Sequence, residues 1–448
     1  MNARFPFAAL TRAAALVASG VLAWTAPAAA QSFSARPFGR ISFYTTSMRY
    51  EVDGLAEPTT MSEFITTVAF RSPDDRADGL EYGLDLRHAG YAAEERSPRV
   101  SIYDGWVGGR FRDKTVRVRA GQMWLNDLGA LGSVAGGLVE YHRASGPDSA
   151  TGLRVGAFGG LEPRVYEFGY APNVRKFGAY VAYDGKGAER HVAGYVNVRN
   201  QNLTERSVLS FTNYVPVGGR FFLYQAAEYD LVGPGGMGHG GLTYFFANVR
   251  VTPASRLELQ GIYNRGRSID TRGIVEAQLG GRPVTTSKID GLLYESAGGR
   301  VYVEVVRGVR VQAGYSRDKT NRDDEASNRV NVGVHVTNLA GTGFDVTATD
   351  TRINRPTGRY DSIYLSVGHD AGRRVYLSGD FSSALSEIRA TGQVDPIRVD
   401  LRPRLNRYSG TAVVTVGGTT TLLVTVERTS DQTMTEFRVL AGISYRLR

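Results

Sequence analysis

Positive charge in this 448-residue sequence is carried almost entirely by arginine, and three arginines lie at alternate positions of strand-like segments: Arg117, Arg119 and Arg310. A guanidinium group keeps its charge in almost any surroundings and pairs bidentately with carboxylates and phosphates. A row of such groups on one face would favour anionic solutes, whereas the simpler interpretation is a set of solvated surface charges. The acids Glu258 and Asp345 lie in similar segments and would line the same surface.

The remaining composition excludes several classes of site. The formal net charge is +9, but acids are interspersed among the arginines and no basic block occurs, which disfavours nucleic-acid binding. The absence of cysteine excludes disulfides, thiol catalysis, thiolate metal sites and lipid acylation of a cysteine. Neither a His-x-x-x-His spacing nor an acidic calcium loop is present, so we expect no metal and no other cofactor.

A hydrolytic site is the alternative chemistry that the histidines allow. His142 lies between Glu140 and Ser145, and Glu140 and His142 would share one strand face. A serine or water nucleophile needs a histidine and an acid to activate it. Neighbours two positions apart are common by chance, so the sequence predicts no catalytic residue and no enzymatic activity.

Residues 1–30 have the features of a secretory signal peptide: a basic start, an apolar run over 13–24 and the small residues 28–30. The apolar run is shorter than the roughly 20 residues of a membrane-spanning helix. We therefore expect the signal peptide to be cleaved and the mature chain, residues 31–448, to form one domain.

The mature chain alternates apolar and polar residues with period two, over segments of roughly 8 to 14 residues bounded by turn-forming residues. In residues 80–87 every even position is apolar, and the odd positions are charged or glycine. A soluble sandwich gives the same alternation, but here short connections such as 307–308 alternate with long ones such as 267–291, which is typical of transmembrane β-barrels. We predict a single all-β, antiparallel, up-and-down barrel of about 22 strands, with 18 or 20 as alternatives. The strands begin near residues 38, 61, 79, 99, 115, 138, 151, 177, 190, 205, 219, 241, 255, 292, 308, 329, 343, 360, 373, 406, 419 and 433.

The last segment carries a more specific signal, because its apolar residues share one parity: Phe437, Val439, Ile443, Tyr445 and Leu447. It resembles the C-terminal assembly signal of bacterial outer-membrane β-barrels, in which a tyrosine stands two places before a terminal aromatic residue. Tyr445 matches, whereas Leu447 replaces the aromatic residue and Arg448 follows it. The resemblance implies periplasmic chaperones, insertion by the barrel assembly machinery, periplasmic termini, and outer-membrane lipids and lipopolysaccharide as surroundings.

Within that class the chain is similar to porins, although no short motif identifies one porin family. TonB-dependent transporters also have 22 strands, but they carry a plug domain before the barrel, and here the first strand begins soon after residue 31. A barrel of this circumference without a plug must be open, narrowed by inward loops or occupied by another chain.

The segment 125–136 would form the third external loop, and it is apolar and rich in glycine. In porins the third loop often folds into the lumen, so the resemblance implies a constriction loop with Asn126 and Asp127 at its tip. We expect Asp127 to lie opposite Arg117 and Arg119. The alternative is a loop that packs on its own rim.

The sequence thus predicts a porin-like channel for passive diffusion of small hydrophilic solutes, with arginines that bias the pore toward anions. The alternative is a structural barrel that anchors an envelope-spanning secretion, adhesion or motility assembly and holds a partner protein in its lumen. A homo-oligomer is compatible with either function.

Overall fold

The alternating segments form long antiparallel strands. The computed structural model describes residues 38–54, 57–72, 79–92, 96–144, 151–164, 169–356, 358–391, 398–401 and 403–447. The predicted signal peptide, Ser145 and Arg448 lie outside these ranges.

Within the described ranges the chain forms 23 strands. The first twelve are β1 (Phe38–Val52), β2 (Thr59–Arg71), β3 (Gly79–Tyr91), β4 (Arg99–Phe111), β5 (Val116–Trp124), β6 (Ser133–Ala144), β7 (Gly152–Pro163), β8 (Tyr170–Asp184), β9 (Arg190–Asn200), β10 (Leu203–Val217), β11 (Phe221–Val232) and β12 (His239–Ala254). The others are β13 (Leu257–Ser268), β14 (Leu292–Val306), β15 (Val309–Thr320), β16 (Ser327–Val336), β17 (Phe344–Arg355), β18 (Gly358–Asp370), β19 (Val375–Thr391), β20 (Arg398–Leu401), β21 (Arg404–Val416), β22 (Thr420–Ser430) and β23 (Met434–Leu447).

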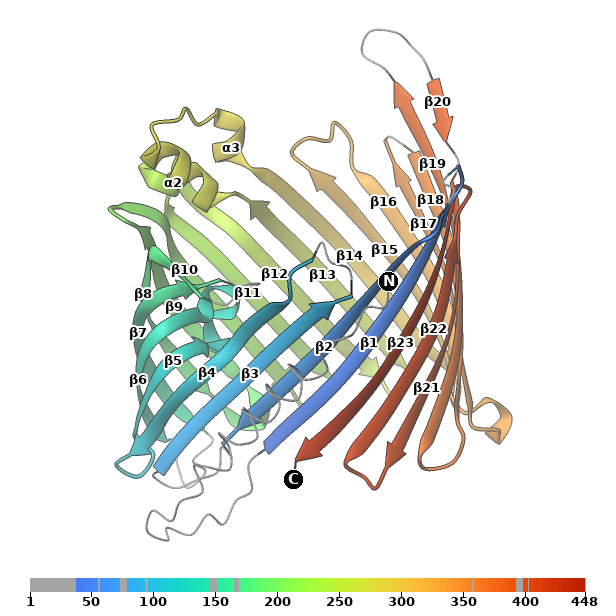
Figure 1. The fold of residues 1–448 in the computed structure, drawn as a ribbon, viewed down its shortest axis with the longest axis horizontal. Coiled ribbons are helices and arrows are strands. Elements are labelled where there is room, and N and C mark those ends of the chain that lie inside the picture. Colours follow the sequence, from blue (N-terminus) through green and yellow to red (C-terminus); the bar gives the residue numbers. More distant parts are fainter. Residues whose placement is uncertain are drawn as a thin grey trace, which may run out of the picture. The chain divides into compact units, whose positions relative to one another are not determined.

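The strands close into a ring, because β1 pairs with both β2 and β23 (Figure 1). The short strand β20 pairs with β19 alone among the described residues, and β19 also pairs with β21, so 22 strands form the wall. Closure leaves no strand edge in the wall unpaired, which a lipid environment requires. The predicted fold class, a closed up-and-down barrel of about 22 strands, is confirmed.

The dimensions of the wall suit a bilayer. Its strands run from 9 residues in β5 to 17 in β19, and a strand needs about 9–11 residues to cross the hydrocarbon core. Gly39 pairs with Leu447, so β1 starts and β23 ends at the same end of the barrel, opposite the end that carries the helices (Figure 1). This architecture is that of outer-membrane β-barrels, and the protein is located in the outer membrane.

Side chains alternate between the two faces of the wall. Large apolar residues on one parity, such as Leu80, Val139 and Leu153, are exposed on the outside. Acids on the other parity, such as Glu81 and Glu140, are buried inside. The pattern follows from the free energy of insertion, since an arginine or lysine that faces lipid at mid-bilayer destabilises the barrel by about 2–4 kcal/mol.

One polar row departs from this pattern. His191, Asn213 and Gln225 lie on the outward parity of β9, β10 and β11 in directly paired positions. His191 Nδ1 lies 3.0 Å from Asn213 Oδ1, and Asn213 Nδ2 donates to Gln225 Oε1 at 3.3 Å. The row therefore satisfies its own hydrogen bonds on the lipid-facing side.

The connections alternate less strictly than predicted. Gly308 completes a tight turn between β14 and β15, but the same end of the barrel also holds the longer β16–β17 connection with η4 (Leu339–Gly341). At the opposite end, only Gln201 and Asn202 separate β9 from β10. The turn between β12 and β13 is equally short, at 255–256, and an irregularity in register precedes it near the end of β12.

The longest connection folds into helices that the sequence pattern did not reveal. They are α2 (Thr271–Leu279) and α3 (Thr286–Asp290), between β13 and β14 (Figure 1). The Asp270 side chain caps α2 by accepting a hydrogen bond from the Gly273 amide at 2.9 Å. Among the described residues no helix is long and apolar enough to span a membrane.

Helix α2 reaches back over the wall to η3 (Pro234–Gly236) and β10, where Ile274 and Val275 are buried. Arg272 pairs with Glu205 of β10 at 3.1 Å and also contacts Glu162 of β7. Burial disfavours the charge of Arg272, but the hydrogen bonds and negative charges of these two carboxylates outweigh burial and raise its pKa above the ordinary value. The ion pairs thus hold the 269–291 loop on the barrel rim.

We expect Arg272→Met to release this loop, because it leaves the buried Glu205 without its guanidinium partner. Limited proteolysis with proteinase K should cut the variant within 269–291 several times faster than the wild type. Arg282→Met removes an exposed arginine from the same loop and is the matched control. Equal cleavage rates for all three proteins would contradict the anchoring role.

Candidate functional site

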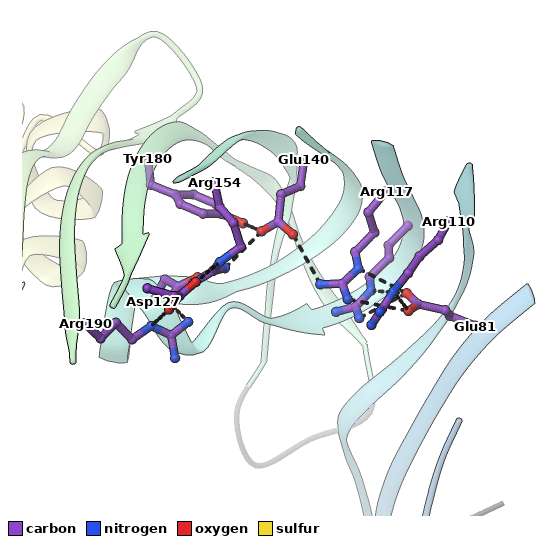
Figure 2. Close-up of polar contacts among 10 residues, drawn as sticks. Glu81, Arg110, Arg117, Asp127, Glu140, Arg154, Tyr180 and Arg190 are labelled. Carbon is purple, nitrogen blue, oxygen red and sulfur yellow. Dashed lines mark hydrogen bonds and ion pairs between the residues drawn. The ribbon is translucent and has the colours of Figure 1, made fainter. Parts of the chain in front are cut away.

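The inner face of strands β3 to β9, together with Asp127 of the third loop, gathers a continuous set of charged side chains and one tyrosine, which we call the lumen network (Figure 2). Each strand contributes its inward positions, so residues distant in sequence meet on one wall. The members are Glu81, Arg110, Arg117, Arg119, Asp127, Glu140, Arg154, Tyr180, Asp184 and Arg190.

One end of the network surrounds Glu81 with three guanidinium groups. Arg117 and Arg119 each lie 3.2 Å from the carboxylate, and Arg110 is in direct contact with it. Arg119 also stacks over the Trp106 ring at 3.8 Å. Glu81 is almost fully buried, and such a carboxylate is tolerated only when cations and hydrogen bonds compensate its charge.

Glu140 is the centre of the network. It accepts hydrogen bonds from Arg117 at 3.2 Å, from Arg154 at 3.1 Å and from the Tyr180 hydroxyl at 2.5 Å. Among the described residues no hydrogen bond joins Glu140 to His142, the neighbour that a hydrolytic site would need. The wall thus uses Glu140 to hold cations and a phenol in place.

Arg154 joins the wall to the third loop. Besides Glu140, it contacts Asp184 at 2.6 Å and Asp127 at 2.7 Å. Arg190 of β9 contacts the same two aspartates, at 3.4 Å in the case of Asp184. Two arginines and two aspartates therefore tie the loop to β7, β8 and β9.

The third loop lies inside the barrel because its leucines are buried there. Its short helix η1 (Asn126–Gly132) contacts β8, β9 and β10, and Leu125, Leu128 and Leu131 join the main hydrophobic cluster. Gly194 makes room for the loop, since a Cβ atom at that position would clash with the Leu128 side chain. The loop spans 125–132, and β6 begins at Ser133, earlier than the predicted residue 138.

Asp127 lines the same cavity as Arg117 and Arg119, which it was expected to face, but it forms its ion pairs with other arginines. Asp127 binds Arg154 and Arg190, whereas Arg117 and Arg119 bind Glu81. The reason is register, because Arg154 and Arg190 lie on strands that face the loop tip. A constricting effect of Asn126 and Asp127 on solute flow stays a prediction.

The opposite wall carries arginines of a different kind. Arg250 of β12, Arg300 of β14 and Arg310 of β15 lie on the inward parity and are exposed to the lumen. Within the described part of the chain none of the three has an ion-pair partner. Arg250 lies over the Phe222 ring at 5.3 Å, and Arg310 lies over Tyr302 at 5.8 Å. These guanidinium groups remain available to solutes.

Two other predicted pore-lining residues lie on the inward parity but differ in their surroundings. Glu258 pairs in register with Tyr302, beside the exposed arginines. Asp345 lies at the start of β17, where its carboxylate accepts a hydrogen bond from the Asn338 amide at 2.8 Å and stabilises the preceding turn. The contribution of either residue to permeation stays a prediction.

A cavity of about 770 Å³ lies between η1 and strands β10 to β14. Arg206 lines it and binds Asp230 at 2.8 Å and Glu228 at 3.1 Å. No sequence motif distinguishes these residues, nor Arg154, Arg190, Arg250 or Arg300. The inward parity of each strand was the signal that could have found them. No cluster of His, Asp and Glu in the described residues is arranged to hold a metal ion.

The C-terminal residues take the expected face of the wall. Phe437, Ile443 and Tyr445 are exposed on the outward parity of β23, and Val439 shares that parity. Their recognition by an assembly machine stays a prediction.

We expect Asp127→Ala to raise the preference for anions, because it removes one negative charge from the lumen network and leaves Arg190 more exposed. It also removes the ion pairs that Asp127 of η1 forms with Arg154 and Arg190 of the wall. The reversal potential in a salt gradient and the single-channel conductance measure both effects. Asp290→Ala removes the same charge from the exposed helix α3 and is the control. Values for Asp127→Ala equal to those of the wild type would contradict the role of Asp127 in the lumen.

Comparisons with known proteins give structural likenesses alone, since neither a protein-family model nor a curated protein matches the sequence. Acinetobacter baumannii OccAB4 is 8% identical, with 93% of this chain and 100% of that chain covered and a TM-score of 0.45. For Pseudomonas aeruginosa OccK7 (OpdD) the identity is 9%, the coverage 92% and 99%, and the TM-score 0.41. P. aeruginosa OccK2 (OpdF), solved in complex with glucuronate, is 10% identical, with 92% of this chain and 97% of that chain covered and a TM-score of 0.36.

Proposed function

We propose that the protein is a porin-like outer-membrane channel for passive diffusion of small hydrophilic solutes, with a preference for anions. The observation that carries this proposal is the difference between the two lumen walls. On one wall four carboxylates form ion pairs with the five arginines of the lumen network and offset most of their positive charge. On the other wall Arg250, Arg300 and Arg310 are exposed, so they set the potential that a passing solute meets.

The orientation in the membrane follows from the same proposal. Outer-membrane barrels have short periplasmic turns and longer external loops. The end that carries η1, α2 and α3 would therefore face the cell exterior, and the start of β1 and the end of β23 would face the periplasm. Export would require cleavage of the signal peptide, residues 1–30.

Solute entry into liposomes tests the proposal. Liposomes that contain the purified protein should swell in isotonic solutions of small sugars and sugar acids, faster for the acids at equal size. Swelling no faster than in protein-free liposomes would contradict a diffusion channel. If such a sealed barrel also copurified stoichiometrically with a periplasmic protein, the function would be that of an anchor.

A further inference from the structure

A second group of cations lies on the outside of the barrel, near the end that carries the helices. We call it the outer basic patch: Arg265 and Arg267 of β13, Glu295 of β14, and Arg317 and Lys319 of β15. Arg265 pairs in register with Glu295, and Glu295 pairs with Lys319. The five residues thus occupy adjoining positions on three neighbouring strands.

The parity of these strands places the patch outside the lumen, although Arg267 at the end of β13 also lines the cavity beside η1. Arg317 shares its parity with Val311 and Tyr315, which are exposed on the outer face. Arg265 shares its parity with Leu259, which is also exposed there. Arg317 and Lys319 are themselves exposed, whereas Arg265 is half-buried against its neighbours.

Cations outnumber the acid within the patch itself, and the adjoining loop adds negative charge with Asp323 and Asp324, where Lys319 donates a hydrogen bond to the Asp324 carbonyl oxygen at 3.2 Å. Four cations face one acid, which leaves 4 − 1 = +3, and within the described residues none of the four forms an ion pair. The Glu295 carboxylate accepts a hydrogen bond from the Tyr263 hydroxyl at 2.6 Å. On β17 and β18, by contrast, the outward Arg352 and Arg359 both bind Asp361, at 2.9 Å and 2.6 Å.

Aromatic residues mark the depth of the patch. Phe245 and Tyr263 pack against each other with ring centroids 5.7 Å apart, and Phe245 lies opposite Arg265 in register. Tyr315 lies two positions from Arg317, toward the middle of β15. Outward aromatic side chains gather where hydrocarbon gives way to headgroups, so the cations lie at headgroup level.

We propose that the outer basic patch binds the phosphorylated glucosamine headgroup of lipid A in the outer leaflet. Arginine matches phosphate bidentately, and neighbouring strands are about 4.8 Å apart, so cations on β13 and β15 can hold two phosphates of one headgroup. A phospholipid offers one phosphate and meets only part of this surface. The site depends on the proposed orientation of the barrel and not on solute conduction.

The test measures lipid binding to the refolded protein in detergent by native mass spectrometry. Arg317→Gln/Lys319→Gln removes the two exposed cations, and Arg300→Gln/Arg310→Gln removes the same charge from the lumen as the matched control. Each cation near an anionic surface contributes enough that losing two should lower lipid A affinity about thirtyfold. The lumen variant should bind as the wild type does, and dephosphorylated lipid A should bind poorly to all three.

Three results would overturn the proposal: no loss in the outer variant, an equal loss in the lumen variant, or displacement of lipid A from the wild type by equimolar phosphatidylglycerol. If the double variant does not fold, the single variant Lys319→Gln, at an exposed position, provides the same comparison. It should lower lipid A affinity about fivefold. The heat-dependent gel mobility of a closed barrel establishes folding for each protein.

Discussion

Replacing Arg154 by methionine is expected to lower the free energy of unfolding by about 3–5 kcal/mol, because the change leaves buried carboxylates without their cation. Arg154 is itself largely buried and bridges Glu140, Asp184 and Asp127. Methionine keeps the apolar stem but cannot donate hydrogen bonds to any of the three acids. A urea titration followed by intrinsic fluorescence measures the change.

The matched control is Arg300→Met, which removes an exposed lumen arginine without an ion-pair partner in the described chain. We expect it to change the unfolding free energy by less than about 1 kcal/mol. Arg154→Lys should restore only part of the stability, since an ammonium group cannot reproduce the fork of a guanidinium. An unfolding midpoint of Arg154→Met equal to that of the wild type would contradict the central role of the network.

The second large effect is expected on ion selectivity. Changing Arg250, Arg300 and Arg310 together to glutamine removes the three exposed cations of one lumen wall and should abolish the anion preference. We expect the anion-to-cation permeability ratio to fall about fivefold at 0.1 M salt and to change much less at 1 M, because the Debye screening length falls from about 10 Å to about 3 Å. The reversal potential in a potassium chloride gradient measures this ratio.

A triple variant on the outer face provides the control for this experiment. Arg49, Arg175 and Arg199 are exposed on outward parities, so their change to glutamine removes equal charge from outside the lumen. We expect its permeability ratio to equal that of the wild type. If the two triple variants shifted the reversal potential equally, selectivity would not arise from the lumen arginines.

The fold was predictable because alternation with period two is a local signal that each strand repeats. The errors fall where that signal is weak. Strand β6 begins with Ser133 and contains Gly136 and Gly137, which give little contrast between faces, so its start was placed too late. The short strand β20, which pairs with the end of β19, spans only four residues, too few to show the alternation.

For the candidate site, the sequence predicts on which face of the wall a residue lies but not which residues form ion pairs with each other. Parity identified Arg117 and Arg119 as inward residues, but it contains no information on which acid lies across two strands or inside a loop. The sequence places Asp127 opposite the arginines of the preceding strand, whereas the register of the barrel brings Arg154 and Arg190 within ion-pair distance of it. Helix α2 spans only nine residues, too few to show a clear helical period, and its contact between Arg272 and Glu205 joins two segments that are distant in the sequence.

Single-channel recording of the purified wild-type protein in a planar lipid bilayer tests the central claim most directly. We predict discrete, stable conductance steps, with a reversal potential in a salt gradient that reports anion preference. A protein that inserts as a folded barrel and yet passes no current, or passes current with preference for cations, would contradict the proposed anion-favouring channel.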